Sequence, residues 1–390
     1  MRRIYFDNNA TTPLDPRVRD AMLPWLGERH GNPSSVHAFG QAAREAVEEA
    51  RAQVAALLGA LPAEVVFTAS GTEANNAVLF AAARRAGGRG HLVVSAFEHP
   101  SIREAAAWLE ATGMEVSRVS PAGDGTVPAA AMTAAVRPDT RLVCLMLAQN
   151  ELGTLQPVEE VAAACRERGT PVLCDAVQAV GKVPVRVAEL GVDYLVLGAH
   201  KFHGPLGAAA LWIRRAAPFE ALLLGGSQER RRRASTENVP SIVGLGRAAQ
   251  IAAAELADRG RHLGSLRDRF EAGLAAIPGA AVHCAASPRL PNTSHLAVHG
   301  VDAESLLIRL DLRGCAVSAG AACASGTVEP SPTLLAAGLS PEEARSSLRV
   351  SFGAANVAAE VDEFLAILAA EVAELRRLAG DPAPYVASRR

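Results

Sequence analysis

The sequence has little net charge, no long apolar segment and no closely paired cysteines. A formal charge of -2 and a pI near 6.6 provide no electrostatic surface for nucleic acid or for an anionic membrane. No apolar run approaches the roughly 20 residues of a membrane-spanning helix. The first residues also lack the apolar core of a secretion signal. We therefore expect a cytoplasmic protein that binds neither nucleic acid nor membrane.

Signatures of metal and nucleotide sites are missing as well. The six cysteines form no CxxC pair, so we expect reduced thiols rather than a disulfide framework. His200 and His203 flank Lys201, but no HExxH motif or cysteine–histidine spacing supports a metal site. No Walker loop occurs, and the glycines at 244 and 246 are too few for a dinucleotide fingerprint.

Short apolar runs that alternate with helical patterns dominate the sequence. The predicted strands are 65–68, 91–95, 114–119, 141–147, 171–175, 193–197 and 208–213, and the predicted helices are 41–59, 70–85, 102–110 and 158–168. This alternation predicts an α/β fold with a mostly parallel sheet covered by helices on both faces.

The C-terminal part of the sequence has a different pattern. A long helix over 242–274 is expected to lead into strands 280–284, 293–298 and 315–318, with helices at 303–312 and 358–378. We therefore predict a large domain of residues 12–256 and a smaller α+β domain of residues 1–11 and 257–390.

Polar side chains follow several of the predicted strands, where active sites of parallel sheets lie. Asp175 closes one apolar run, and Lys201 follows another 26 residues later. Singly, they are more typical of a turn cap and a surface lysine. Together, an amine and a carboxylate are what pyridoxal phosphate requires: one forms a Schiff base and the other pairs with the pyridinium nitrogen.

Two further strand ends carry weaker signals. Ser70 and Glu73 fit a helix capping box, and the backbone N–H groups of that helix start could bind an anion. Most such boxes are only caps. His99 could stack on a planar cofactor or carry protons, although a lone histidine is more often structural.

Three features of the remaining sequence are candidates for chemistry. Cys323 lies in a loop of small residues, where an exposed thiol could be a nucleophile, whereas Cys315 borders apolar residues and is expected to be an inert core thiol. Arg349 interrupts an apolar strand and needs an anionic partner such as a substrate carboxylate. The charged run 228–233 is typical of a solvated loop, and it leads to Thr236, a possible phosphate contact.

A series of motifs extends along nearly the whole chain, at residues 5–13, 31–35, 71–73, 98–99, 150–154, 175–178, 199–205, 228–238 and 318–330. In these motifs the chain resembles the NifS/IscS-type cysteine desulfurases, a branch of the class V aminotransferase group among the fold-type I pyridoxal phosphate (PLP) enzymes. The loop of residues 320–331 is similar to the long cysteine-bearing loop of that branch.

The resemblance implies roles around the cofactor ring. By it, Lys201 forms the Schiff base, Asp175 pairs with the pyridinium nitrogen, and His99 stacks on the ring. Asn150 and Gln178 contact the ring oxygen.

The resemblance also implies the phosphate and substrate contacts. The implied phosphate ligands are Gly71, Thr72 and His200, joined by Thr236 from the neighbouring subunit of a homodimer. Arg349, with Asn32 nearby, takes the substrate carboxylate. Cys323 receives the sulfur of L-cysteine as a persulfide and passes it to an acceptor such as an iron–sulfur scaffold protein. There Cys323 could transiently ligate a nascent cluster.

This chain departs from the family pattern at several positions. Gly198 replaces a usual serine and so lacks one phosphate hydrogen bond. The other departures are Ser227 for a histidine, Arg231 and Ser235 for glycines, Ala321 and Ala324 for hydroxyl residues, and Ala354 for an arginine. The expected function is a cysteine desulfurase. The alternatives are a selenocysteine lyase, another class V aminotransferase, and a non-catalytic assembly partner.

Overall fold

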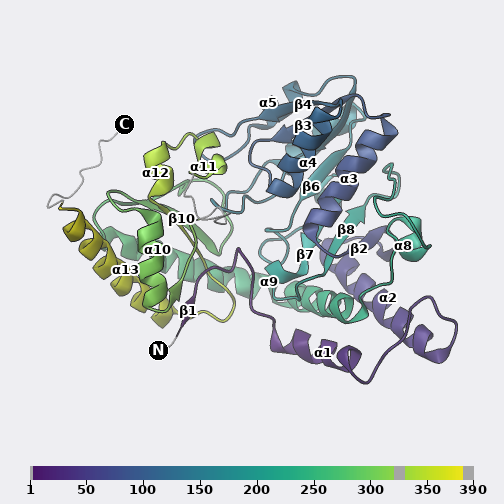
Figure 1. Cartoon of the computed structure of the whole chain (residues 1–390), viewed down its shortest axis with the longest axis horizontal. Helices are drawn as coiled ribbons and strands as arrows, with labels where there is room; N and C mark the ends of the chain where they lie inside the picture. The colour runs from purple at the N-terminus through teal and green to yellow at the C-terminus, as the bar shows by residue number, and fades with distance from the viewer. Residues whose placement is uncertain (1–2, 320–329, 381–390) are drawn as a thin grey trace.

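A seven-stranded sheet forms the centre of the larger part of the molecule (Figure 1). The computed structural model describes residues 3–319 and 330–380. Across the sheet the strands are β2 (Val65–Thr68), β8 (Ala209–Ile213), β7 (Tyr194–Gly198), β6 (Val172–Asp175), β5 (Thr140–Cys144), β3 (His91–Ser95) and β4 (Glu115–Val119). β4, β3, β5, β6 and β7 pair in parallel, while β8 runs antiparallel to both β7 and β2.

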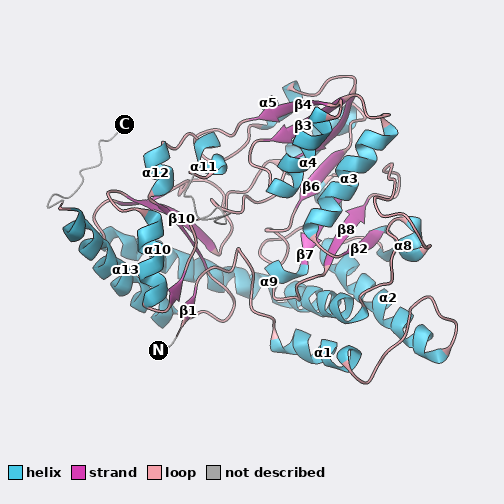
Figure 2. Ribbon diagram, viewed as in Figure 1, coloured by secondary structure: helices cyan, strands magenta, loops and turns pink. Residues whose placement is uncertain are grey.

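Helices cover both faces of this sheet because successive strand residues point to opposite faces (Figure 2). In β7, Leu195 and Leu197 belong to one buried cluster, and Tyr194 and Val196 belong to the other. α3 (Gly71–Arg85) and α4 (Pro100–Ala111) cover the second face. The first face packs against α1 (Pro16–Leu26), α2 (Ala38–Leu58), α6 (Val158–Glu167) and the start of α9 (Val239–Gly273).

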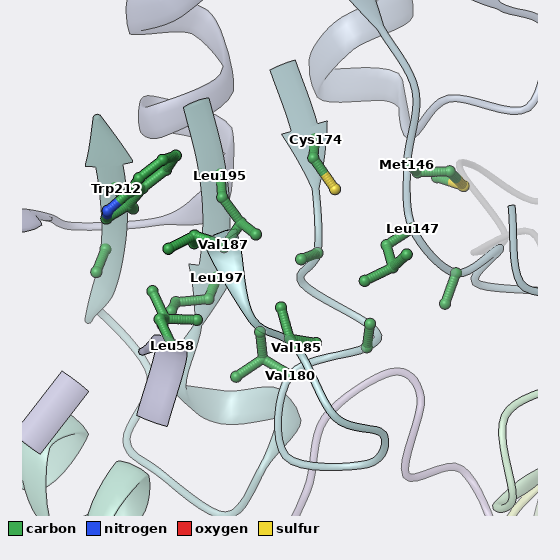
Figure 3. Close-up of a cluster of buried hydrophobic side chains, with 14 of the residues drawn as sticks. Leu58, Met146, Leu147, Cys174, Val180, Val185, Val187, Leu195, Leu197 and Trp212 are labelled. Atoms are coloured by element: carbon green, nitrogen blue, oxygen red, sulfur yellow. The ribbon is translucent and has the colours of Figure 1, made fainter. Parts of the chain in front are cut away.

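The close-up in Figure 3 shows the first cluster from inside the molecule. Side chains of β6, β7 and β8, including Cys174, Leu197 and Trp212, converge there with Val187 of the short α7 (Val187–Leu190). α5 (Ala129–Ala134) and α8 (Gln228–Arg231) complete the helices of this part. Cys174 and Leu197 immediately precede the strand ends of β6 and β7, so this core holds both strand ends in place.

The smaller part has its own sheet and its own core. β9 (Ala280–Val282), β10 (Thr293–Val298) and β12 (Ser347–Ser351) pair antiparallel, and β1 (Ile4–Tyr5) pairs in parallel with β11 (Cys315–Ala316). The helices are α10 (Ala303–Leu312), α11 (Pro332–Ala336), α12 (Pro341–Arg345) and α13 (Ala358–Ala379). α9 connects the two parts: its Leu245 lies in the core of the larger part and its Phe270 in that of the smaller.

Most predicted elements are present, and the mostly parallel sheet is confirmed. Some bounds shift, most clearly for the predicted strand 141–147, which is Thr140–Cys144, and three further details differ. The predicted strand 315–318 is limited to Cys315–Ala316, where Cys315 is buried as expected. The charged run 228–233 is not a solvated loop, because Glu229 is buried and accepts two hydrogen bonds from Arg51 of α2, at 2.7 and 2.9 Å. Ser70 caps α3 as predicted, but the Glu73 carboxylate accepts from the backbone N–H of Ala69.

No helix among residues 3–319 and 330–380 is both long and apolar enough to cross a membrane.

Candidate active site

A cavity of about 270 Å³ opens at the carboxyl ends of the parallel strands. It is lined by Ser70, Gly71, Thr72, Asn75, His99, Ser101, Met146, Ala148, Asn150, Asp175, Val177, Gln178, Gly198, His200 and Lys201. These residues follow β2, β3, β5, β6 and β7, so segments that are far apart in sequence meet at one edge of the sheet. Polar residues that follow the predicted strands thus converge, as expected for a mostly parallel sheet.

Lys201 lies in a short 3₁₀ turn directly after β7. Its Nζ donates to the backbone carbonyls of Asn9 at 2.6 Å and Ala10 at 2.7 Å. Burial, and then the positive charge of Arg349, lower the pKa of the Lys201 amine to about 8. A pKa of about 8 leaves about a tenth of the amine unprotonated at pH 7, far more than the ordinary lysine pKa would. The amine is therefore suited to attack a carbonyl and to carry protons.

Asp175 ends β6 and is buried. Its Oδ1 accepts from the backbone N–H of Val177 at 3.0 Å, and its Oδ2 accepts from Nδ2 of Asn75 at 2.8 Å. Two donors thus hold the carboxylate at the cavity wall. Its negative charge acts on both Lys201 and His99.

A chain of hydrogen bonds connects Asp175 to His99. Asn75 donates to Asp175 and also to Oγ of Ser101 at 2.9 Å, and that Oγ lies 2.9 Å from Nδ1 of His99. His99 is the N-cap of α4, and burial lowers the pKa of its ring. The imidazole is therefore neutral near pH 7, with one nitrogen engaged and its orientation fixed.

The opposite end of the cavity is shaped for an anion. Gly71 and Thr72 form the first turn of α3, where backbone N–H groups have no partners within the helix. A Cβ at Gly71 would lie 3.1 Å from Cγ2 of Val177, so a larger residue would crowd this position. Nδ1 of His200 lies 3.1 Å from Oγ1 of Thr11, and burial lowers the pKa of His200 to about 4.

Some predicted site residues do not line the cavity. Asn32 and Thr236 are exposed. Arg349 is buried in β12 beside the cavity, where it donates to the carbonyl of Asn150 at 3.0 Å and to Asp7 at 2.7 Å. In the structure its carboxylate partner is Asp7, and the predicted contact with a substrate carboxylate stays a prediction. Cys323 lies outside the described residues.

Four residues around this site were not predicted: Asn75 and Ser101 line the cavity, and Asn9 and Lys182 form hydrogen bonds with Lys201 and Gln178 of its lining. Asn75 lies one helical turn after Gly71, and Ser101 lies two residues after His99, so spacing from the predicted strand ends could have identified both. Asn9 and Lys182 give no comparable local signal, because their partners come from distant segments.

A mostly parallel sheet with a buried amine and a buried carboxylate at its carboxyl edge, joined to a smaller α+β part, defines the fold-type I class of PLP-dependent transferases. The aminotransferase class-V family model matches residues 4–364, and the chain belongs to this family.

Named relatives are similar over almost the whole length. A cysteine desulfurase IscS of Methanosarcina thermophila is 41% identical, covering 97% of this chain and 94% of that protein. A cysteine desulfurase of Cereibacter sphaeroides is 44% identical, covering 97% and 98%. Among solved structures, one titled NifS-like protein has a TM-score of 0.90 and 36% identity, covering 96% of this chain and all of that one.

The residues of the cavity fit the cofactor of this family. The donor set contains an amine of lowered pKa, a fixed carboxylate, a neutral ring and a helix start that is free to bind an anion. These match the aldehyde, the ring nitrogen, the ring face and the phosphate of PLP. The chain is therefore a PLP-dependent enzyme of the class V aminotransferase family.

Proposed function

We propose that this enzyme is a cysteine desulfurase, which converts L-cysteine to L-alanine and transfers the sulfur through Cys323. The observation that carries the proposal is the shared cavity of Lys201, Asp175 and His99 in a chain that matches named cysteine desulfurases over 97% of its length. PLP, when bound, supplies the electron sink that permits loss of an α-proton and cleavage at Cβ.

The residues that would hold the cofactor are those that share the cavity. We assign covalent attachment to Lys201, the ring nitrogen to Asp175, the ring face to His99 and the ring oxygen to Asn150 and Gln178. The proposed phosphate contacts are Gly71, Thr72 and His200. The lowered pKa of Lys201 supports a second role, in which its amine takes the α-proton of the substrate and later returns it.

The substrate side of the reaction is assigned to three residues. Arg349, with Asn32, would bind the carboxylate of L-cysteine, and the guanidinium next to the cavity supports this. The thiolate of Cys323 would attack the substrate sulfur. The Cβ–S bond then breaks, its electron pair stays on Cβ, and a proton completes L-alanine. Cys323 keeps the sulfur as a persulfide. The two sulfur atoms together lose two electrons and Cβ gains the same two, so the step needs no external oxidant or reductant.

The sulfur requires an acceptor, for which we propose an iron–sulfur scaffold protein at which Cys323 could briefly ligate the growing cluster. We further propose a cytoplasmic homodimer with the domain division 12–256 against 1–11 plus 257–390. The exposed positions of Thr236 and Asn32 support the dimer, because a second subunit could bring both residues to the cavity mouth.

The decisive experiment compares two cysteine variants. Cys323→Ser should release no sulfide from L-cysteine and form no persulfide. Cys284→Ser is the matched control, because among residues 3–319 and 330–380 it is the cysteine that is not fully buried, and it should match wild type. Sulfide release by Cys323→Ser at the wild-type rate would exclude the persulfide mechanism.

Cofactor attachment has its own test. Borohydride reduction should fix pyridoxyl on Lys201 and not on Lys182, and peptide mapping distinguishes the two. Comparing alanine yields from cysteine and selenocysteine separates a desulfurase from a selenocysteine lyase. Strict dependence on a keto-acid acceptor would instead indicate an aminotransferase.

A further inference from the structure

Lysine occurs at only two positions of the chain, 182 and 201, against 37 arginines. Lys182 is buried and Lys201 is half-buried at the same edge of the sheet, and both donate to Asn9. Lys201 Nζ donates to the Asn9 backbone carbonyl at 2.6 Å, and Lys182 Nζ donates to its side-chain Oδ1 at 3.0 Å. Lys201 attaches the cofactor, but the proposed function gives Lys182 no role.

Only one orientation of the Asn9 side-chain amide satisfies the hydrogen-bonding groups around it. Its Nδ2 donates to Oγ1 of Thr293 at 2.9 Å, and its Oδ1 accepts from Lys182 and from Nδ2 of Asn292, each at 3.0 Å. Its backbone carbonyl accepts from Lys201 and also from Nε2 of Gln178 at 2.9 Å. Because a backbone carbonyl can only accept, the NH₂ end of Gln178 must face Asn9.

Lys182 holds the other end of the same amide. Its Nζ donates to Oε1 of Gln178 at 2.8 Å, four residues earlier in the chain. The preceding Gly181 has φ 78°, and a Cβ there would lie 2.5 Å from Cβ of Phe202, so the chain turns closely past Phe202. This turn places Lys182 fully inside the protein.

The arrangement is energetically unusual. A buried amine is normally compensated by a carboxylate, yet the partners of Lys182 Nζ among residues 3–319 and 330–380 are two amide oxygens. Burial accordingly lowers the pKa of Lys182 well below its usual range. An aliphatic residue would fill this position without that desolvation cost. The presence of an amine is therefore explained by the hydrogen bonds that it donates to Asn9 and Gln178.

We propose that Lys182 is a positioning residue that locks the Gln178 amide with its oxygen turned away from the cavity. Gln178 lines the cavity. One of its two amide N–H groups is bound to Asn9, and its oxygen is turned to Lys182, so the donor left for a ligand is the second N–H. The cavity therefore offers a donor to an oxygen of the cofactor, and a flipped amide would offer an acceptor that repels it.

The test is a double-mutant cycle measured on cofactor binding. Lys182→Met, Gln178→Ala and the double variant are stripped of cofactor and titrated with PLP. The position of the visible absorbance band is recorded for each reconstituted protein. Val183→Ala is the control, because it shortens a partly buried neighbour in the same turn without touching the network. Thermal unfolding shows which variants are folded.

Lys182→Met should weaken PLP affinity about tenfold, equivalent to about 1.4 kcal/mol. It should shift the absorbance band in the same direction as Gln178→Ala, and the double variant should be no worse than Gln178→Ala. The proposal would be overturned if Lys182→Met weakened PLP binding by the same factor in wild type and in Gln178→Ala. It would also be overturned if Lys182→Met weakened PLP binding in neither. Val183→Ala should keep wild-type affinity and spectrum.

The inference rests on the cofactor site and not on the desulfurase reaction. PLP titration requires no turnover, so a failed double-mutant cycle and a failed Cys323→Ser experiment are separate outcomes. If Lys182→Met unfolds, Gln178→Glu provides the second measurement. That carboxylate keeps the contact with Lys182 but loses both N–H groups, the one bound to Asn9 and the one for the cavity, so affinity should fall as in Gln178→Ala. Wild-type affinity would overturn the proposal, because residue 178 would then have no donor for Lys182 to position.

Discussion

The proposed active site draws on two regions that position their side chains in different ways. The strand-end group comprises Gly71, Thr72, His99, Asp175 and Lys201, each of which follows a strand of the seven-stranded sheet within a few residues. The junction is the region where the N-terminal segment meets the larger and the smaller part of the molecule. It comprises Asp7, Asn9, Lys182, Asn292, Thr293 and Arg349.

The backbone ladder of the sheet places the strand-end group. Asp175 is itself the last residue of β6, and Lys201 follows β7 by three residues. The junction depends instead on side-chain hydrogen bonds between residues far apart in sequence, such as Asn9 with Thr293 and Arg349 with Asp7. Under the proposed function, the strand ends would supply the reactive groups, and the junction would set their orientation and charge.

The strongest disruption of the strand-end group should be Asp175→Asn. The amide keeps the shape but loses the negative charge that holds a ring nitrogen protonated. We expect kcat to fall about 100-fold, since each unit of pKa mismatch corresponds to ~1.4 kcal/mol. Borohydride should still trap pyridoxyl on Lys201. Asp193→Asn, just before β7 at the opposite end of the strands, is the control and should retain wild-type kcat.

Arg349→Met tests whether the junction sets the charge of a strand-end residue. Removing the guanidinium should raise KM for L-cysteine about 10- to 100-fold, as for loss of a charge-assisted hydrogen bond. It should also raise the pKa of Lys201, because the charge of Arg349 helps lower that pKa to about 8. Recombination of cofactor-free protein with PLP needs the neutral amine, so its pH midpoint should move upward from about 8.

The matched control for that experiment is Arg345→Met, an exposed arginine four residues earlier in the same part of the fold. It should leave both KM and the pH midpoint unchanged. An unchanged midpoint in Arg349→Met would show that the junction acts only by holding substrate.

The same contrast explains what sequence alone could predict. The sequence places Asp175, Lys201 and His99 at strand ends because each closes or follows an apolar run. An apolar run indicates a buried strand whether or not the neighbouring strands are known. The direction of β8 could not be predicted, since the run over 208–213 is equally apolar in a parallel or an antiparallel strand. Burial of Glu229 likewise depends on Arg51, which is 178 residues away.

The contacts of the junction could not be predicted from local sequence patterns for the same physical reason. Only the fold brings the amine of Lys182 to Asn9, 173 residues away. Motif resemblance drew attention to the segment around Asn9, but not to its hydrogen bonds. Local rules therefore recover groups placed by their own strand, whereas groups placed by distant partners require the tertiary structure.

Glu98, which follows β3, tests the strand ends through the pH dependence of folding stability. Its Oε1 accepts from Ser95 at 2.7 Å and from the backbone N–H of Met146 at 2.8 Å, and burial raises the pKa of the carboxyl to about 8. Between pH 4.5 and 8 the folded state therefore keeps a proton that the unfolded state loses, so stability falls as pH rises across this range.

Glu98→Gln carries no such proton. Its melting temperature should be close to that of wild type at pH 5 and several degrees higher at pH 9. Glu104→Gln, at an exposed position of α4, should track wild type at both pH values. A constant difference between Glu98→Gln and wild type across this pH range would mean that Glu98 is ionised in the fold.

The smallest expected effect comes from adding a group to the strand ends. Gly198 has φ -127° and ψ 126°, which any residue adopts, and a Cβ there would meet Val177 and His200 at 3.6 Å or more. A serine therefore fits without strain.

If the phosphate lies at Thr72 and His200, Gly198→Ser should tighten PLP binding up to about tenfold by one further hydrogen bond. Gly198→Ala fills the same space without a donor and should leave the affinity unchanged. Equal affinities for the serine and alanine variants would place the phosphate away from β7, and the helix start of α3 would then have to bind it alone.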